Sequence, residues 1–142
     1  VFVGGGDAEK YRTMADGYAA AKKINFVGPK SNPFGYMGGA LANLLASYSE
    51  GLPTVLIEGM AVGTLNIASD CKNGPREILM SGDAGLLFEP GDVNALAQHM
   101  QDVWQKKAPV KKMVANATKS LGRFEAKFVI NQMVDLFKSC ED

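Results

Sequence analysis

Short apolar segments alternate along the chain with longer stretches of helical periodicity, and this alternation restricts the possible folds more than any other feature. The segments end in glycine- or proline-containing turns and fall at residues 1–3, 24–27, 44–47, 65–68 and 85–89. Segments this short and this apolar are typical of strands buried on both faces, as in parallel sheets. The alternation therefore predicts an α/β fold in which a parallel sheet carries helices on both faces.

The stretches between and after these segments place apolar residues at helical spacing. Pro53 suits the first turn of a helix, Asp92 is a good N-cap, and Gly38 with Gly39 weakens one expected helix. Helices are expected at residues 8–23, 36–42, 53–61, 75–79, 93–105, 110–121 and 126–139. Trp104 is expected to pack on the apolar side of its helix.

Length and charge limit the class of protein. A chain of 142 residues is a common size for one domain, and its 15 basic and 15 acidic residues cancel. No global field therefore draws the chain onto nucleic acid, and no apolar run approaches the roughly 20 residues that cross a bilayer. The chain starts abruptly in a strand-like segment without an initiator methionine, so we expect it to be part of a longer protein.

The cysteines do not indicate a disulfide framework or a zinc site. Cys71 and Cys140 are widely spaced and are accompanied by a single histidine. Both thiols are expected to be small apolar fillers in a reducing cytoplasm.

A basic cluster near one helix end could contact an anionic membrane face, although a solvated helix end explains it equally well: Lys106, Lys107, Lys111 and Lys112.

The turn after residues 44–47 is the strongest candidate for a ligand site. In a doubly wound sheet, ligands bind at the carboxyl ends of the strands, where helix N-termini present unpaired N–H groups. Gly51 leaves room for a ligand to approach the backbone. The N–H groups near Leu52, Thr54 and Val55 are therefore expected to face a diphosphate.

Two carboxylates flank this turn. Glu58 follows Glu50 by eight residues, which corresponds to on the order of 10 Å along a helix axis. Carboxylates accept hydrogen bonds from sugar hydroxyls, so the pair could hold both ends of a nucleoside diphosphate sugar. Taken alone, this spacing is found more often in solvated helix charges than in a binding site. The glycines at 4–6 lack dinucleotide or P-loop spacing and predict a tight turn that borders a ligand without binding phosphate.

The segment 49–60, Ser-Glu-Gly-Leu-Pro-Thr-Val-Leu-Ile-Glu-Gly-Met, resembles the Glu-x7-Glu motif of family 4 retaining glycosyltransferases. The similarity continues in the family's order through most of the chain, at 25–28, 69–71, 74–79, 85–88 and 91–92. The Gly-Pro-Arg-Glu-Ile-Leu form at 74–79 is similar to enzymes that build bacterial lipopolysaccharide and capsule.

This resemblance implies that residues 1–142 are the Rossmann-like C-terminal, donor-binding domain of a two-domain GT-B enzyme. By motif position, Glu50 would contact the transferred sugar and Glu58 the ribose. The sugar and phosphates would contact Gly51, Leu52, Pro53, Thr54 and Val55, and the base would contact the backbone at Gly28, Pro29 and Lys30. The implied enzyme is a retaining hexosyltransferase that uses a nucleotide sugar, with uridine diphosphate as the expected carrier and a glycan or lipid-linked acceptor in cell-surface polysaccharide synthesis.

The sequence departs from the family pattern in several places. Residues 38–43 replace a segment that usually holds an Ala-Asp pair, and Leu65 replaces a usual proline. The family's basic pair precedes the first segment seen here, as does the acceptor domain, so we expect binding but little or no transfer by this chain alone. No Asp-x-Asp pattern occurs, which predicts a site without metal.

Two other functional classes remain open from the sequence. A sugar-nucleotide epimerase shares the architecture but requires acid and base groups that this chain does not display. A noncatalytic nucleotide-binding module could use the same fold. The expected location is the cytoplasm, with possible peripheral contact to the inner face of the cell membrane.

Overall fold

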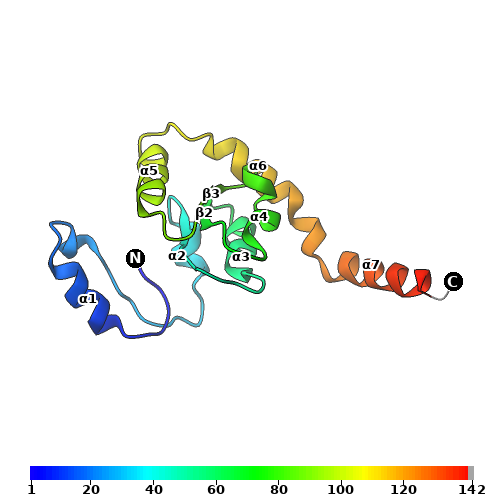
Figure 1. The fold of residues 1–142 in the computed structure, drawn as a ribbon, viewed down its shortest axis with the longest axis horizontal. Helices are drawn as coiled ribbons and strands as arrows, with labels where there is room; N and C mark the ends of the chain where they lie inside the picture. The colour runs from blue at the N-terminus through cyan, green and yellow to red at the C-terminus, as the bar shows by residue number, and fades with distance from the viewer. Residues whose placement is uncertain (141–142) are drawn as a thin grey trace. The chain divides into compact units, whose positions relative to one another are not determined.

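The computed structural model describes residues 1–140 (Figure 1). The chain divides into two compact units, Val1–Gly35 and Tyr36–Asp142. Each unit is described by itself. The short helix α2, Phe34–Gly38, spans the boundary between them.

The first unit holds the helix α1, Ala8–Asp16, and the 3-10 turn η1, Ala21–Lys23. Its two strand-like segments run parallel but pair only at Phe2 and Phe26, whose rings stack with centroids 4.8 Å apart. The backbone N–H of Gly4 extends this pairing by donating to the Gly28 carbonyl at 3.1 Å. The single expected helix over 8–23 is broken because Gly17 ends α1.

The second unit is built on a parallel sheet of three strands in the order β1-β2-β3. The strands are β1, Asn43–Leu45; β2, Asn66–Ser69; and β3, Leu86–Phe88. The helices are α3, Thr54–Ala61; α4, Pro75–Ile78; α5, Val93–Trp104; α6, Val110–Ser120; and α7, Ala126–Ser139, with 3-10 turns η2, Met80–Gly82, and η3, Leu121–Phe124. The predicted α/β class is confirmed, and each expected strand of this unit is present, β1 and β3 at a shorter length and β2 at the same length but shifted by one residue.

Helices cover both faces of the sheet, as predicted. Leu45, Ala68 and Leu87 are register neighbours on one face, where they pack against apolar residues of α3, α4, α6 and η3. On the opposite face, Ile67 and Leu86 are neighbours and pack against α5 and the start of α6. The alternation of side chains along each strand sends successive residues to these two cores.

The edge strand β1 is less covered than its sequence predicts. Leu44 pairs with Ile67 on the α5 face, yet it remains 49% exposed. The expectation of a fully buried strand is wrong here, because within residues 36–140 β1 has a strand partner on one side only. Next to it lies a groove of about 230 Å³, which we call the apolar groove, lined by Leu41, Ala42, Leu44, Ile67, Met100, Val103 and Trp104.

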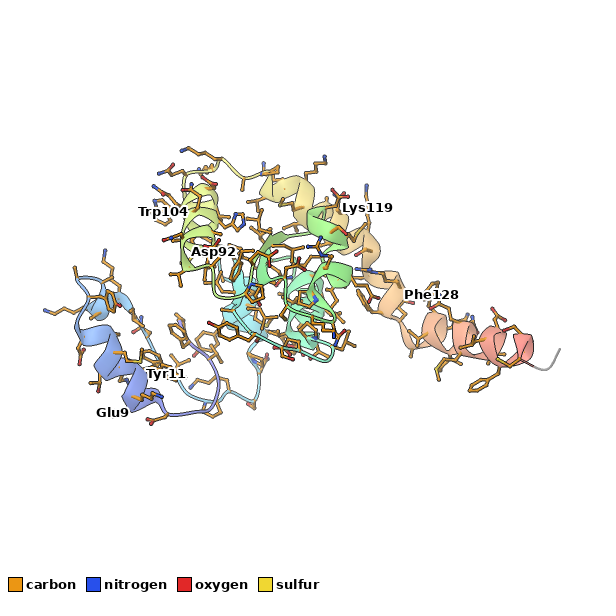
Figure 2. The ribbon with its side chains drawn as sticks, in the orientation of Figure 1. Glu9, Tyr11, Asp92, Trp104, Lys119 and Phe128 are labelled. Atoms are coloured by element: carbon orange, nitrogen blue, oxygen red, sulfur yellow. The ribbon has the colours of Figure 1, made fainter. Side chains whose placement is uncertain are left out.

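Two further packing expectations are corrected. Trp104 is 74% exposed at the end of α5 (Figure 2), so it lines the apolar groove without being buried in it. The reason is that the helix turns its buried face toward the sheet through Val103, the neighbouring residue. Cys71 is buried as predicted, whereas Cys140 is exposed at the end of α7.

The helix ends follow local chemistry closely. The Asp92 carboxylate accepts a hydrogen bond from the Ala95 N–H at 2.9 Å and caps α5, as predicted. Pro53 was expected in the first turn of α3. It is instead the N-cap, one residue before the helix begins at Thr54. The guanidinium of Arg123 donates to the Glu77 and Ile78 carbonyls at 3.0 and 2.6 Å, which ties η3 to the end of α4.

The last helix, α7, buries none of its residues within the described chain. Its apolar side chains, among them Phe128 (Figure 2), remain 40 to 67% exposed. No helix among residues 1–140 combines the length and the apolar character that crossing a bilayer requires.

The tight approach of β3 to β2 can be tested at Gly85. A Cβ there would lie 2.8 Å from the Asn66 carbonyl oxygen and 3.0 Å from the Leu79 methyl groups, all in the buried core. We expect Gly85→Ala to lower the free energy of unfolding by about 1–3 kcal/mol through overpacking. Chemical denaturation measures this, and Gly122→Ala, with no atom within 4 Å of the new Cβ, is the control. Equal stability of the two variants would contradict the proposed contact.

Candidate functional site

The carboxyl ends of β1, β2 and β3 lie at one edge of the sheet because the strands are parallel. The segments that leave this edge are 46–53, 70–74 and 89–92. A side-chain hydrogen bond ties the first of these segments to the end of β2, since the Ser69 hydroxyl donates to the Ser47 carbonyl. The sequence placed its candidate site on the first of these segments, and the structure puts that segment at the expected edge.

The start of α3 presents unpaired backbone donors. The N-cap Pro53 offers no side-chain cap, and the Leu56 N–H donates back to the Pro53 carbonyl at 3.0 Å. Within residues 1–140, the N–H groups of Leu52, Thr54 and Val55 donate no hydrogen bond, and all three residues are exposed. Free N–H groups at a helix start, together with the positive end of the helix dipole, favour an anion such as phosphate.

The two carboxylates lie on different elements. Glu50 is in the extended turn between β1 and α3, whereas Glu58 lies on α3 itself, and both are half-buried. The distance between the two carboxylates was expected from the rise of a helix running from Glu50 to Glu58. Because the helix begins only at Thr54, that expected distance does not describe this pair. Neither carboxylate forms an ion pair within residues 1–140, where the ion pairs are Glu9 with Arg12 and Asp70 with Arg76.

The turn before α4 packs directly on the turn before α3. Gly74 has a φ of 101°, and a Cβ there would overlap the Pro53 ring, with Pro53 Cγ at 3.2 Å and the Gly51 carbonyl oxygen at 3.6 Å. Only glycine tolerates both the backbone angle and the close approach. Gly74 thus supports the shape of the Gly51–Pro53 turn.

A polar cavity that the sequence did not predict lies beyond β2 and β3. Its volume is about 340 Å³, and it is lined by Asp70, Arg76, Ser81, Leu87, Phe88, Glu89, Asp92 and Ala95. Asp70 forms an ion pair with Arg76 within it. The signal that could have found it is the presence of charged residues directly after two neighbouring strands, Asp70 after β2 and Glu89 after β3.

The remaining candidates, Gly28, Pro29 and Lys30, belong to the first unit. Gly28 has a φ of 71° and lines a cavity of about 130 Å³. The glycines at 4–6 line the same cavity with Phe2, Tyr11 and Phe26, whereas Pro29 and Lys30 are exposed. The glycine turn and Gly28, which the sequence treated as separate features, therefore meet in one place.

No group of three or more histidine, cysteine, aspartate or glutamate side chains is placed to hold a metal ion within the described part of the chain.

Comparison with known proteins assigns the chain to a family. The family described as "Glycosyl transferases group 1" matches residues 1–120. The chain is therefore a domain of the group 1 glycosyltransferase family, in agreement with the resemblance of its Glu-x7-Glu segment.

Curated relatives are bacterial glycosyltransferases that extend well beyond this chain. The putative glycosyltransferase EpsD of Bacillus subtilis is 30% identical over 143 residues, covering 100% of the chain and 37% of that protein. The lipopolysaccharide 1,6-galactosyltransferase of Salmonella typhimurium is 31% identical over 103 residues, covering 70% of the chain and 29% of that protein. The chain thus spans well under half the length of these relatives.

Solved structures show the same fold. The apo lipopolysaccharide outer core galactosyltransferase WaaB superposes with a TM-score of 0.84 at 27% identity, covering 96% of the chain and 39% of that structure. Anabaena Alr3699/HepE, solved in complex with UDP, has a TM-score of 0.85 at 19% identity, covering 96% of the chain and 40% of that structure. The α/β fold matches the C-terminal half of GT-B enzymes.

The support that Gly74 gives to the turn before α3 is testable. Gly74→Ala should cost more than the roughly 1–2 kcal/mol of a left-handed backbone alone, because the new Cβ also collides with Pro53. Gly82→Ala is the matched control, since its φ of 104° is nearly the same and no atom lies within 4 Å of its Cβ. Denaturant unfolding of both variants measures the difference, and equal losses would argue against the contact.

Proposed function

We propose that residues 1–142 form the nucleotide-sugar-binding domain of a longer, two-domain retaining hexosyltransferase. The start of α3 is the observation that carries this proposal. There, unpaired N–H groups follow a glycine turn at the carboxyl edge of a parallel sheet, and half-buried carboxylates lie on both sides in sequence. Diphosphate and sugar hydroxyls are the ligand groups that this combination suits.

The roles follow from the chemistry of each group. The N–H groups of Leu52, Thr54 and Val55 would neutralise part of the diphosphate charge, with Gly51 and Pro53 shaping their turn. Glu50 would accept hydrogen bonds from the transferred sugar, and Glu58 from the ribose. Preorganised donors of this kind stabilise the negative charge that develops on a departing nucleotide.

By motif position, residues of the first unit are proposed to contact the base of the nucleotide. Gly28, Pro29 and Lys30 would contact it through the backbone, and the left-handed φ of Gly28 supports a close backbone approach there. We infer uridine as the base, which is supported by the UDP bound in the HepE structure of the same fold. The donor site is proposed to work without a metal ion.

The acceptor is proposed to be a glycan or a lipid-linked sugar of the cell surface, because several relatives are lipopolysaccharide or undecaprenol-linked glycan transferases. We also propose a cytoplasmic location, with peripheral contact to the inner face of the membrane. Acceptor binding and the basic pair at the diphosphate would come from the rest of the polypeptide, so this chain alone is expected to bind donor with little or no transfer. Membership of a glycosyltransferase family supports this function over an epimerase-like domain or a noncatalytic module.

Nucleotide selectivity tests the proposal. By calorimetric titration, UDP should bind more tightly than GDP or ADP, and Glu58→Ala should weaken UDP binding by about 1–3 kcal/mol through loss of hydrogen bonds to the ribose. Glu125→Ala, an exposed carboxylate at the start of α7, should leave the affinity unchanged. Absence of heat with all three nucleotides would rule out a nucleotide site in this chain.

The backbone donors can be tested separately. Thr54→Pro removes one N–H at the first position of α3, where proline is tolerated. We expect UDP affinity to fall by about 1–3 kcal/mol, as for a lost bond to a charged group, while uridine affinity stays the same.

Val93→Pro is the matched control. It makes the same substitution at the start of α5, where the preceding residue has nearly the same backbone angles, φ −77° and ψ 84° against φ −72° and ψ 84° before α3. The N–H that it removes donates to the Gly91 carbonyl at 2.9 Å, so the control also loses one internal hydrogen bond. Equal weakening of UDP and uridine by Thr54→Pro, or of UDP by both variants, would show that these N–H groups do not hold phosphate.

A further inference from the structure

The side chains of two asparagines, the half-buried Asn43 and the buried Asn66, meet the single glycine of α3. Asn43 and Asn66 are directly opposite each other on β1 and β2, on the face that packs against α3. Asn66 is fully buried, and its side-chain Nδ2 donates to the Leu56 carbonyl of α3 at 2.9 Å. The amide of a strand residue is thus bonded to the first turn of the helix that carries Glu58.

Gly59 is where the two amides reach the helix. A Cβ on Gly59 would overlap Asn66 Oδ1, and it would lie 2.6 Å from Asn43 Nδ2. Glycine inside a helix costs about 1 kcal/mol relative to alanine. The absence of a side chain here is therefore explained by the amides that fill its place. We call Asn43, Asn66 and Gly59 the amide cluster.

The amide cluster is chemically self-complementary. Asn66 Oδ1 is an acceptor and Asn43 Nδ2 a donor, both are buried, and both lie next to the same Gly59 position without another partner within the described chain. We expect rotation of the side chains to pair the two atoms in an amide–amide hydrogen bond. Buried polar groups are favoured only when paired in this way, and a directional bond fixes the position of packed elements more sharply than apolar contact does.

The connections of the amide cluster point to its role. Asn43 lies on β1, which leads into the turn that holds Glu50, whereas Gly59 and the Leu56 carbonyl lie on α3, next to Glu58 in sequence. The cluster therefore brings α3, which carries Glu58, against the strand that leads into the turn of Glu50, next to the central strand β2.

We propose that Asn66 and Asn43 are positioning residues for the donor site. They fix α3 along the sheet so that Glu58 and the first-turn N–H groups keep a set position relative to Glu50. This inference rests on the proposed nucleotide-sugar function. It adds residues that contact no part of the nucleotide and act through α3.

Ligand discrimination separates positioning from general stability. The parent chain and Asn66→Val are titrated with UDP and with 2′,3′-dideoxy-UDP, which lacks the hydroxyls assigned to Glu58. We expect Asn66→Val to weaken UDP about five- to tenfold, the equivalent of one hydrogen bond, and to leave the dideoxy analogue nearly unchanged.

Asn116→Val is the matched control, because Asn116 Nδ2 donates to the Asp83 carbonyl at the same 2.9 Å but on α6. An unchanged UDP-to-dideoxy ratio in Asn66→Val, or an equal change in Asn116→Val, would overturn the positioning role while leaving the donor site in place. Failure of the parent to bind UDP would remove the donor site and this role together.

A rescue experiment tests the contact without any ligand. Gly59→Ala alone should lower the melting temperature because its Cβ collides with the amides, and Asn66→Val alone should lower it by removing the hydrogen bond to the Leu56 carbonyl. The double variant should be less destabilised than the sum of the two losses, since the valine removes the Oδ1 atom with which the Cβ collides. Purely additive losses would contradict the cluster.

Hydrogen exchange completes the test for variants that fold poorly. Asn43→Ala, at the edge of the cluster, should speed amide exchange in α3 more than in α5. Uniform exchange across both helices would overturn the inference.

Discussion

The burial of β2 is the constraint on which the rest of the second unit depends. All of its residues are buried, and it is paired with β1 on one side and β3 on the other. Three of its neighbouring contacts shape the candidate site: Asn66 bonds α3, Ser69 bonds the segment after β1, and the N–H of Asp70 donates to the Phe88 carbonyl at 2.7 Å. A central strand that is partly polar thereby holds the three loops at its carboxyl edge in place.

Local rather than global electrostatics explains how a chain of zero formal net charge can suit an anion. The charges cancel over the molecule, so attraction must come from oriented backbone groups at short range, where solvent screens them least. The turn before α3 provides such groups because Pro53 supplies no cap and Gly51 supplies no side chain. The close packing of Gly74 on Pro53 keeps this turn from collapsing onto its own donors.

Periodicity and turn residues were sufficient to predict the fold class, the bounds of α7, and the cap of α5 by Asp92. They did not predict the exposure of Leu44, because the sequence of an apolar segment does not indicate how many strands pair with it. The start of α3 was placed one residue early, since proline fits both the N-cap and the first turn. The amide cluster and the cavity at Asp70 and Arg76 depend on contacts between residues far apart in the sequence. The local signs of them are an asparagine in an apolar strand for the cluster, and charged residues directly after β2 and β3 for the cavity. The motif located Glu50 and Glu58 in the sequence, but only the structure shows that Glu50 lies in a turn and Glu58 on α3.

The exposure of Trp104 gives the molecule a built-in optical reporter. It is the single tryptophan in the sequence, and it lines the apolar groove next to β1. Indole emission shifts to shorter wavelength when the ring leaves water. Any segment or protein that covers the groove therefore changes the fluorescence of one identifiable side chain, without a label and without interference from another indole.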